Sequence, residues 1–279
     1  MSPNPLSKFF RQPAIYIRLP SAGKGWPAGA LDMPVSGEIP VYPMTAIDEI
    51  TYRTPDALFN GEAVVSVLGS CVPSIQDPWS VPTTDLDALL IAIRIASYGH
   101  EIDVDSTCPA CSTEHSYSMD LRSFMDQLKS TDYSEPYTLG DLTFYFKALN
   151  YREVTDNGLE QFEYQKTLQA LNDANNMEER DKVARLNSMM KNLIAVTVKA
   201  MSQSIVEVRT QDTVVSDREH IEEFLTQCDR TVFNQIRDHV IGIREQNELQ
   251  PLDITCPNCE HKYQQNFTLD MANFFGSAS

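Results

Sequence analysis

Cysteine is the residue type in this chain most able to do chemistry, because four of the six cysteines form two Cys-Pro-x-Cys pairs. The pairs are Cys108 with Cys111 and Cys256 with Cys259. One such pair supplies two thiolates from a single tight turn, which is half of the tetrahedral ligand set that a structural Zn²⁺ prefers. The two pairs together therefore predict one structural Zn²⁺ with four cysteine ligands.

The two cysteine pairs lie in an internal near-repeat. Residues 103–121 and 251–270 both run from an acidic residue and a threonine into Cys-Pro-x-Cys, a polar turn, a strand candidate and a Leu-Asp or Asp-Leu helix start. Each copy predicts a β-knuckle, and two knuckles sharing one metal would pair as a zinc ribbon. This pairing would tie the C-terminal end of the chain to its middle, with residues 120–250 as a large insertion.

Three other interpretations of the cysteine pairs stay open. His115 and His261 lie close to their pairs, so two separate sites are conceivable, although each would have only three nearby ligands. A redox pair normally opens a helix after a strand, whereas polar, turn-like residues follow both pairs here. A site that no longer holds metal would leave the cysteines as packing residues. A catalytic zinc is disfavoured, because four thiolates leave no position for water.

The remaining cysteines and the N-terminal sequence indicate the cellular compartment in which the chain folds. Cys71 and Cys228 have no nearby partner in the sequence and are expected to be buried apolar thiols. The first residues of the chain lack the continuous apolar stretch of a secretory signal. We therefore expect the chain to fold and assemble in a reducing cytoplasm, where disulfides do not persist.

No arrangement typical of an enzyme accompanies the cysteines. Gly23-Lys24-Gly25 is not a phosphate loop, because Arg18 stands where such a loop needs a glycine and no Ser or Thr follows the lysine. The five histidines are scattered and match no metal-protease or triad signature. We therefore expect a protein that is not an enzyme, without catalytic residues and without a small-molecule substrate.

Charge and hydropathy narrow the possible partners. The chain has 39 acidic and 22 basic residues and a formal net charge of −17. This sign repels phosphate, so we expect neither a nucleic acid nor an anionic membrane as a partner. No run of 18 apolar residues exists, so no transmembrane helix is expected.

Residues 1–43 are predicted to form an extended, proline-rich arm. Their eight prolines fix φ and remove amide donors, so a long helix cannot form there. The composition of residues 14–19 predicts a short strand. Four basic residues precede residue 38, against a single acidic residue, Asp32. Such an arm could grip a neighbouring subunit or wrap its own domain, and both interpretations stay open.

Residues 44–119 are predicted to form a helical core that ends in the first knuckle. Thr45 is expected to cap a helix that has Asp48 at its third position. Short helices are expected at residues 54–60 and 62–68. The clearest helix spans residues 85–98, with Thr84 as its N-cap and Gly99 as its stop. It is apolar nearly all round, so we expect it to be buried.

Residues 120–250 are predicted to form a helical insertion with a β-hairpin, and residues 251–279 the second knuckle and a C-terminal helix. The elements expected are a helix at 118–129, a hairpin at 137–149, a helical pair over 153–201 that breaks at 173–176, a strand at 204–209, a helix at 217–225 capped by Ser216 and a helix at 230–246. The predicted fold class is α+β, mainly helical, with zinc-ribbon-like β-knuckles closing a helical body.

Several motifs between residues 18 and 111 form a recognisable series. They are LPSAGK (19–24), GEIPVYPMTA (37–46), TPDALFNG (54–61), SCVP (70–73), AIRIASYG (92–99) and the first Cys-Pro-x-Cys pair. This series resembles the baseplate protein family of T4-like, contractile-tailed bacteriophages. The resemblance covers the N-terminal third and, through the knuckles, the C-terminal end of the chain.

The resemblance implies a structural component of a viral tail baseplate, located in the virion and bound to other phage baseplate or tail proteins. It brings no catalytic residues. A hub or tail assembly chaperone that is absent from the finished virion is the alternative, because an acidic surface could shield a basic client.

Overall fold

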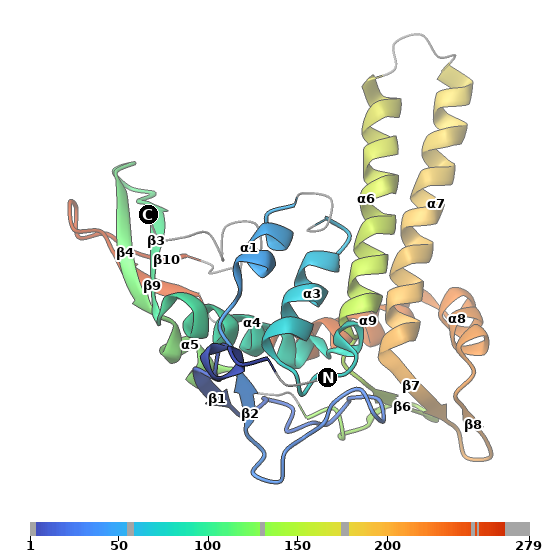
Figure 1. The fold of residues 1–279 in the computed structure, drawn as a ribbon. Coiled ribbons are helices and arrows are strands. Elements are labelled where there is room, and N and C mark those ends of the chain that lie inside the picture. The colour runs from blue at the N-terminus through green and yellow to red at the C-terminus, as the bar shows by residue number, and fades with distance from the viewer. Residues whose placement is uncertain are drawn as a thin grey trace. The chain divides into compact units, whose positions relative to one another are not determined.

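The computed structural model describes residues 4–54, 59–128, 132–173, 179–246, 249 and 251–265. The chain divides into two compact units: residues 1–130 with 246–279 form unit 1, and residues 131–245 form unit 2. Helices and small sheets are mixed (Figure 1), with 48% helix and 20% strand. The predicted mixture of helices and small sheets, with helix predominant, is therefore confirmed.

Unit 1 begins with a short 3-10 helix, η1 (Ser7–Phe9), and a two-stranded antiparallel sheet. Its strands are β1 (Ile15–Ile17) and β2 (Ile39–Val41). The strand predicted at residues 14–19 is thus limited to three residues. Pro13 and Pro20 flank it and lack the amide donors that would extend the ladder.

The predicted capping of the first helix is confirmed. Helix α1 (Ala46–Tyr52) has Thr45 as its N-cap, and Thr45 and Asp48 form a reciprocal capping box. Helix α3 (Glu62–Cys71) covers the helix predicted at residues 62–68. The helix predicted at 54–60 falls mostly on residues 55–58, which lie outside the described residues.

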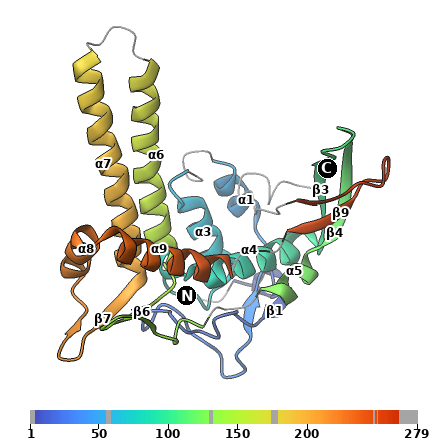
Figure 2. The same cartoon turned by 180° about the vertical axis from the view of Figure 1, so that it is seen from behind.

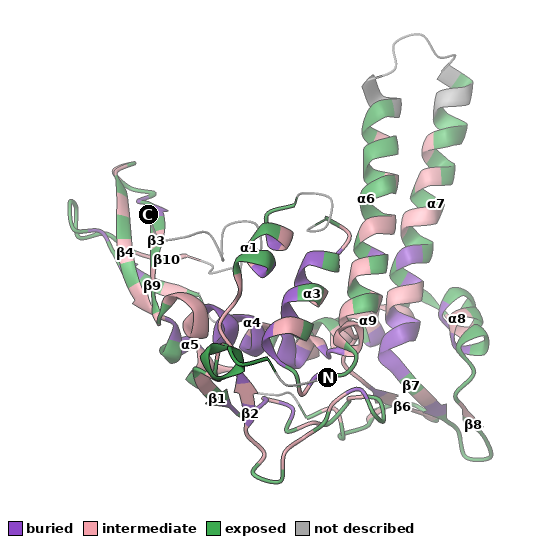
Figure 3. Cartoon of the chain, viewed as in Figure 1, coloured by how far each residue is buried: buried purple, intermediate pink, exposed green. Residues whose placement is uncertain are grey.

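The central helix, α4 (Thr83–Tyr98), ends before Gly99 as predicted, but the expected N-cap is wrong. The cap is Pro82, so Thr84 lies inside the first turn and Asp85 takes the third helical position. The helix is buried along most of its length, as its apolar composition predicted (Figure 3). A short 3-10 helix, η2 (Pro78–Ser80), precedes it. None of the helices described combines the length and apolarity needed to cross a membrane.

The carboxylate of Asp85 joins the N-terminal arm to α4. Its side chain is completely buried and accepts hydrogen bonds from the Ser21 backbone N–H at 2.8 Å, the Ser21 hydroxyl and the Trp26 indole N–H at 2.7 Å. Burial raises the pKa of Asp85, and the three donors oppose that rise. This carboxylate therefore fixes the loop that follows β1 to the start of the central helix.

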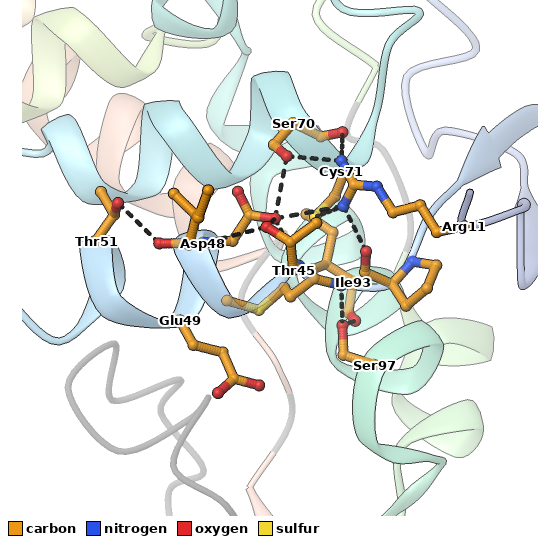
Figure 4. Close-up of polar contacts among 12 residues, drawn as sticks. Arg11, Thr45, Asp48, Glu49, Thr51, Ser70, Cys71, Ile93 and Ser97 are labelled. Carbon is orange, nitrogen blue, oxygen red and sulfur yellow. Dashed lines mark hydrogen bonds and ion pairs between the residues drawn. The ribbon is translucent and has the colours of Figure 1, made fainter. Parts of the chain in front are cut away.

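Arg11 makes a second connection between the arm and the helices (Figure 4). Its guanidinium donates to the Ser70 carbonyl at 2.8 Å and to the Ser70 hydroxyl at 2.7 Å, and it lies 3.3 Å from the Asp48 carboxylate. Asp48 also accepts from the Thr45 backbone N–H at 2.7 Å. One arginine thus joins the start of α1 to the end of α3. These contacts, with those of Ser21 and Trp26 to Asp85, attach the arm to helices of its own unit.

The knuckle hairpins complete unit 1. Strands β3 (Glu101–Thr107) and β4 (Glu114–Asp120) pair antiparallel, as do β9 (Leu252–Thr255) and β10 (Lys262–Gln265). The helix predicted at residues 118–129 begins later, because residues 118–120 continue β4. Helix α5 (Leu121–Gln127) starts after Asp120, whose carboxylate caps the Arg122 amide. The predicted C-terminal helix lies outside the described residues.

The described part of unit 2 contains a four-stranded antiparallel sheet and four helices. The sheet order is β5 (Tyr137–Leu139), β6 (Leu142–Phe146), β7 (Ile205–Arg209) and β8 (Val214–Val215). Helices α6 (Tyr151–Asp173) and α7 (Glu179–Ser204) form a hairpin between β6 and β7. Figure 2 shows α8 (Arg218–Gln227) and α9 (Arg230–Glu245) near the base of that hairpin.

The core of unit 2 lies between its sheet and the bases of its helices. It includes Phe144 from the sheet, Met201 from α7, Ile221 from α8 and Ile236 from α9. The hairpin, helices and strand predicted in this region are confirmed within a few residues. The break predicted at residues 173–176 falls mostly outside the described residues. Ser216 is not the cap of α8, however, because Asp217 caps it by accepting from the His220 amide.

We predict that Arg11→Met lowers the free energy of unfolding of unit 1 by about 2 kcal/mol, because part-buried acceptors lose a charged donor. Urea unfolding followed by tryptophan fluorescence measures this, since both tryptophans, Trp26 and Trp79, lie in unit 1. Arg18→Met is the matched control. Its ion pair with Glu38 is solvent-exposed, so a loss below about 1 kcal/mol is expected. Equal losses in both variants would contradict the role given to Arg11.

Candidate metal centre

Four cysteine sulfurs from the two knuckles lie together in unit 1. Their Sγ atoms are all within 4.8 Å of one another. The Sγ atoms of Cys108 and Cys259 are 3.7 Å apart, as are those of Cys111 and Cys256. A tetrahedron with metal–sulfur bonds of about 2.3 Å has edges of about 3.8 Å. The four sulfurs therefore have the spacing of a tetrathiolate metal site, and the cysteines are free thiols rather than disulfides.

The two knuckles are built by the same backbone hydrogen bonds. In the first, the Cys108 amide donates to the Thr113 carbonyl at 3.0 Å, and the Ser112 amide donates to the Cys108 carbonyl at 2.8 Å. In the second, the corresponding bonds run from the Cys256 amide to His261 and from Glu260 to Cys256, both at 2.9 Å. The internal repeat seen in the sequence is therefore also a repeat of local structure.

A left-handed residue closes each knuckle. Ser112 has φ of 57° and Glu260 has φ of 58°, and each directly follows the second cysteine of its pair. This conformation is uncommon for residues other than glycine, and it reverses the chain so that the second strand can pair with the first. The tight turn holds both sulfurs of a pair on the same side of the hairpin.

Side chains also join one hairpin to the other. The Asn258 amide lies 3.7 Å from the Cys111 sulfur and donates to the Thr113 hydroxyl at 3.2 Å. The hydroxyls of Ser106 and Tyr263 share a hydrogen bond of 2.7 Å. These contacts orient the two halves of the cluster. The sequence analysis did not predict these contacts. The one visible signal was that the variable position of Cys-Pro-x-Cys is Ala110 in the first pair and the polar Asn258 in the second.

The electrostatics of the cluster require a cation if every sulfur is to be ionised. Hydrogen bonds from the Thr113 hydroxyl and backbone, with a further one from Asn258, lower the pKa of Cys111 to about 5. A backbone hydrogen bond from His261 lowers the pKa of Cys259, but desolvation and the neighbouring sulfurs outweigh it and raise that pKa to about 12. A metal ion would replace the remaining protons and allow four thiolates to coexist.

The other candidate ligands lie apart from this cluster. Within the described part of the chain, the cluster of four cysteines includes no histidine or carboxylate. His261 stacks on Tyr263, with ring centroids 6.1 Å apart. Cys71 is buried at the end of α3, and burial raises its pKa to about 12. Cys228 is only half-buried and belongs to unit 2. The geometry therefore favours one shared site over two histidine-completed sites.

Comparison with known proteins shows the family to which the chain belongs. A family model described as T4 bacteriophage base plate protein matches residues 30–276, which is most of the chain. The chain belongs to this family. No curated protein and no solved structure matches it.

Membership of the T4 base plate family supports a structural role in a phage baseplate. It implies contacts with other phage structural proteins and a location in the virion tail. The match also spans both knuckles and the whole of unit 2. The resemblance in the sequence motifs of residues 18–111 is therefore confirmed at the level of the family.

We predict that Asn258→Ala weakens retention of a bound metal about tenfold, because residues that orient metal ligands typically have effects of this size. Competition of the metal-loaded protein with a chelator measures it. Gln264→Ala is the control, since the Gln264 amide bonds only to Asp253 within its own hairpin among the contacts found. Equal retention in the two variants would show that the contact across the knuckles does not support the site.

Proposed function

We propose that this protein is a structural component of a contractile phage tail baseplate. In this proposal, one Zn²⁺ bound by Cys108, Cys111, Cys256 and Cys259 fastens the C-terminal knuckle to the middle of the chain. The ion is architectural, since four thiolates leave no open coordination position. The protein acts through contacts with other baseplate or tail proteins, and no residue of the chain is assigned a catalytic role.

The observation that carries the zinc assignment is the 3.7 Å spacing between sulfurs that belong to knuckles far apart in the sequence. Thiolate sulfur is a soft ligand, and a tetrahedral set of four selects Zn²⁺ or iron–sulfur chemistry over hard cations. A single mononuclear ion fits sulfurs this close together. We propose a domain scheme around this shared site. The arm of residues 1–43, the core of 44–119 and the knuckle of 251–279 belong together, and residues 120–250 are inserted between the two knuckles.

The metal would supply stability that the hairpins lack. Strands β9 and β10 have four residues each, and Ile254 is their only buried apolar side chain among the residues described. A two-stranded hairpin of this size is marginal in water. Binding of Zn²⁺ to a folded four-cysteine site contributes about 10 kcal/mol or more in zinc-finger peptides. The second knuckle is therefore expected to depend on the ion for its attachment.

We predict one Zn²⁺ per chain, lost when any one of the four knuckle cysteines is replaced by serine. Elemental analysis of the purified protein measures the metal, and Cys228→Ser, in unit 2, is the control that keeps it. Loss from variants in both knuckles is the decisive result, because it requires a shared site. Full metal content in either Cys108→Ser or Cys256→Ser would contradict the shared four-cysteine site. Iron in place of zinc would contradict the assignment of the metal as zinc.

The alternative role is an assembly chaperone that leaves before the tail is complete, and the net charge of −17 would suit the shielding of a basic client. We predict instead that quantitative mass spectrometry of purified virions finds the chain at a fixed ratio to known baseplate proteins. Its absence from virions, together with its presence in assembly intermediates, would favour the chaperone role. This result is independent of the metal content.

A further inference from the structure

The distal part of the α6–α7 hairpin has no core of its own. Among the side chains described, residues 159–170 of α6 and 180–195 of α7 include no buried one. Figure 3 shows this part of the hairpin in the colours of exposed and intermediate residues. Helices in proteins gain most of their stability from packing of an apolar face, and a pair of helices without further neighbours buries little apolar surface.

An apolar stripe on α7 lacks a cover. We define the α7 stripe as Val183, Met190 and Ile194, whose side chains are 52%, 53% and 59% exposed. Residues seven and eleven positions apart fall on one face of a helix. Nearer the base, the same face continues through Val198 and Met201, which are buried in the core of unit 2. The face is therefore a packing surface that is covered at its base and open above it.

Contact with α6 uses a different line of α7. Val196 is buried, Gln203 accepts a hydrogen bond from Asn157 of α6 at 2.6 Å, and Lys199 bonds to Glu160 of α6 at 2.8 Å. Between this line and the α7 stripe lie the half-buried Leu186 and Leu193. An apolar surface this broad is typical of a helix that packs between two neighbours in a bundle.

The charge of the hairpin helices does not oppose their pairing with a second copy. The whole chain carries −17, so most surfaces of two copies repel one another. Helix α6 has five acidic and two basic residues, and α7 has two acidic and five basic residues. The two helices together are neutral. Two copies can therefore approach through their hairpins without the repulsion that opposes contact elsewhere.

The spacing of the α7 stripe suits a twofold axis. With the exposed Asn187 included, its positions are separated by four, three and four residues, which reads the same in both directions. An antiparallel pair of α7 helices thus places Val183 of one copy against Ile194 of the other, and Asn187 against Met190. In that register Arg180 and Lys191 do not face their own counterparts, whereas a parallel pair would place like charges together.

We propose that two copies of this chain associate through the α7 stripe, with the α7 helices antiparallel across a twofold axis. The two hairpins then form a four-helix bundle in which Leu186 and Leu193 lie near the centre. This association does not rest on the baseplate role or on the metal, because it uses residues of unit 2 only.

Sedimentation equilibrium of the full chain tests the association directly. We expect twice the chain mass, and we expect Met190→Glu with Ile194→Glu to return it to the single-chain mass, because charges would enter the contact. Val214→Glu is the control, since Val214 is 60% exposed on β8 of the same unit and lies outside the stripe. Circular dichroism of each variant checks that the helices remain. A wild-type protein that stays monomeric at every concentration overturns the proposal, as does a dimer that survives the double substitution.

Disulfide cross-linking tests the direction of the helices. A mixture of Val183→Cys and Ile194→Cys chains should form a disulfide between the two new cysteines under mild oxidation, identified by mass spectrometry of the linked peptides. Each variant alone should not link through its new cysteine, because the two copies of one position lie about 16 Å apart in an antiparallel pair. Self-linking of either variant would contradict the antiparallel arrangement. The wild-type chain gives the background from its own cysteines.

Discussion

The meeting of four cysteine sulfurs within 4.8 Å is the constraint that brings the C-terminal knuckle back to the middle of the chain. Two unit charges about 4 Å apart repel by about 4 kcal/mol at an effective dielectric constant of 20, so four thiolates cannot stay ionised without a cation. The sulfurs come from knuckles on either side of unit 2 in the sequence. The chain must therefore leave unit 1, complete unit 2 and return, and any ion bound there holds that return in place.

Two buried carboxylates hold the N-terminal arm of unit 1. Asp48 and Asp85 each collect donors from the N-terminal arm, through Arg11 and through Ser21 with Trp26. A region with so many prolines forms few backbone ladders, so side-chain hydrogen bonds to charged acceptors attach it instead. These two carboxylates thus attach a segment that has too little regular structure to hold itself.

The two units offer different means of assembly. Unit 1 has a buried helical core and the cysteine cluster, and its arm is bound to its own helices. Unit 2 presents a long helical hairpin, and among the side chains described its apolar α7 face is buried at the base and exposed above it. Among the side chains described, the exposed α7 stripe is the feature that most directly points to a partner.

Much of the chain could be predicted from local signals. The spacing of the cysteine pairs, the Thr45–Asp48 capping box, the apolar run before Gly99 and the helical periodicity of α6 and α7 all depend on neighbours in the sequence. Short-range hydrogen bonds and side-chain periodicity determine such features, so the structure agrees with the predictions made from them. The errors lie at element boundaries. Helix α4 starts two residues earlier than predicted, directly after Pro82. Asp120 caps α5, which starts three residues later than predicted, and Asp217 rather than Ser216 caps α8, because each carboxylate accepts from an amide in the first turn.

Tertiary structure alone decided the contacts between distant segments. Nothing in the sequence near Arg11 indicates that it lies beside Asp48 and Ser70, or that Ser21 and Trp26 meet Asp85. The packing of whole elements likewise places Asn258 beside Cys111. It also buries the apolar face of α7 at its base and leaves the α7 stripe exposed. The sequence by itself determined the residue types, the knuckles and most of the helices. Which of those residues meet depends on burial and chain topology, which no local window of sequence contains.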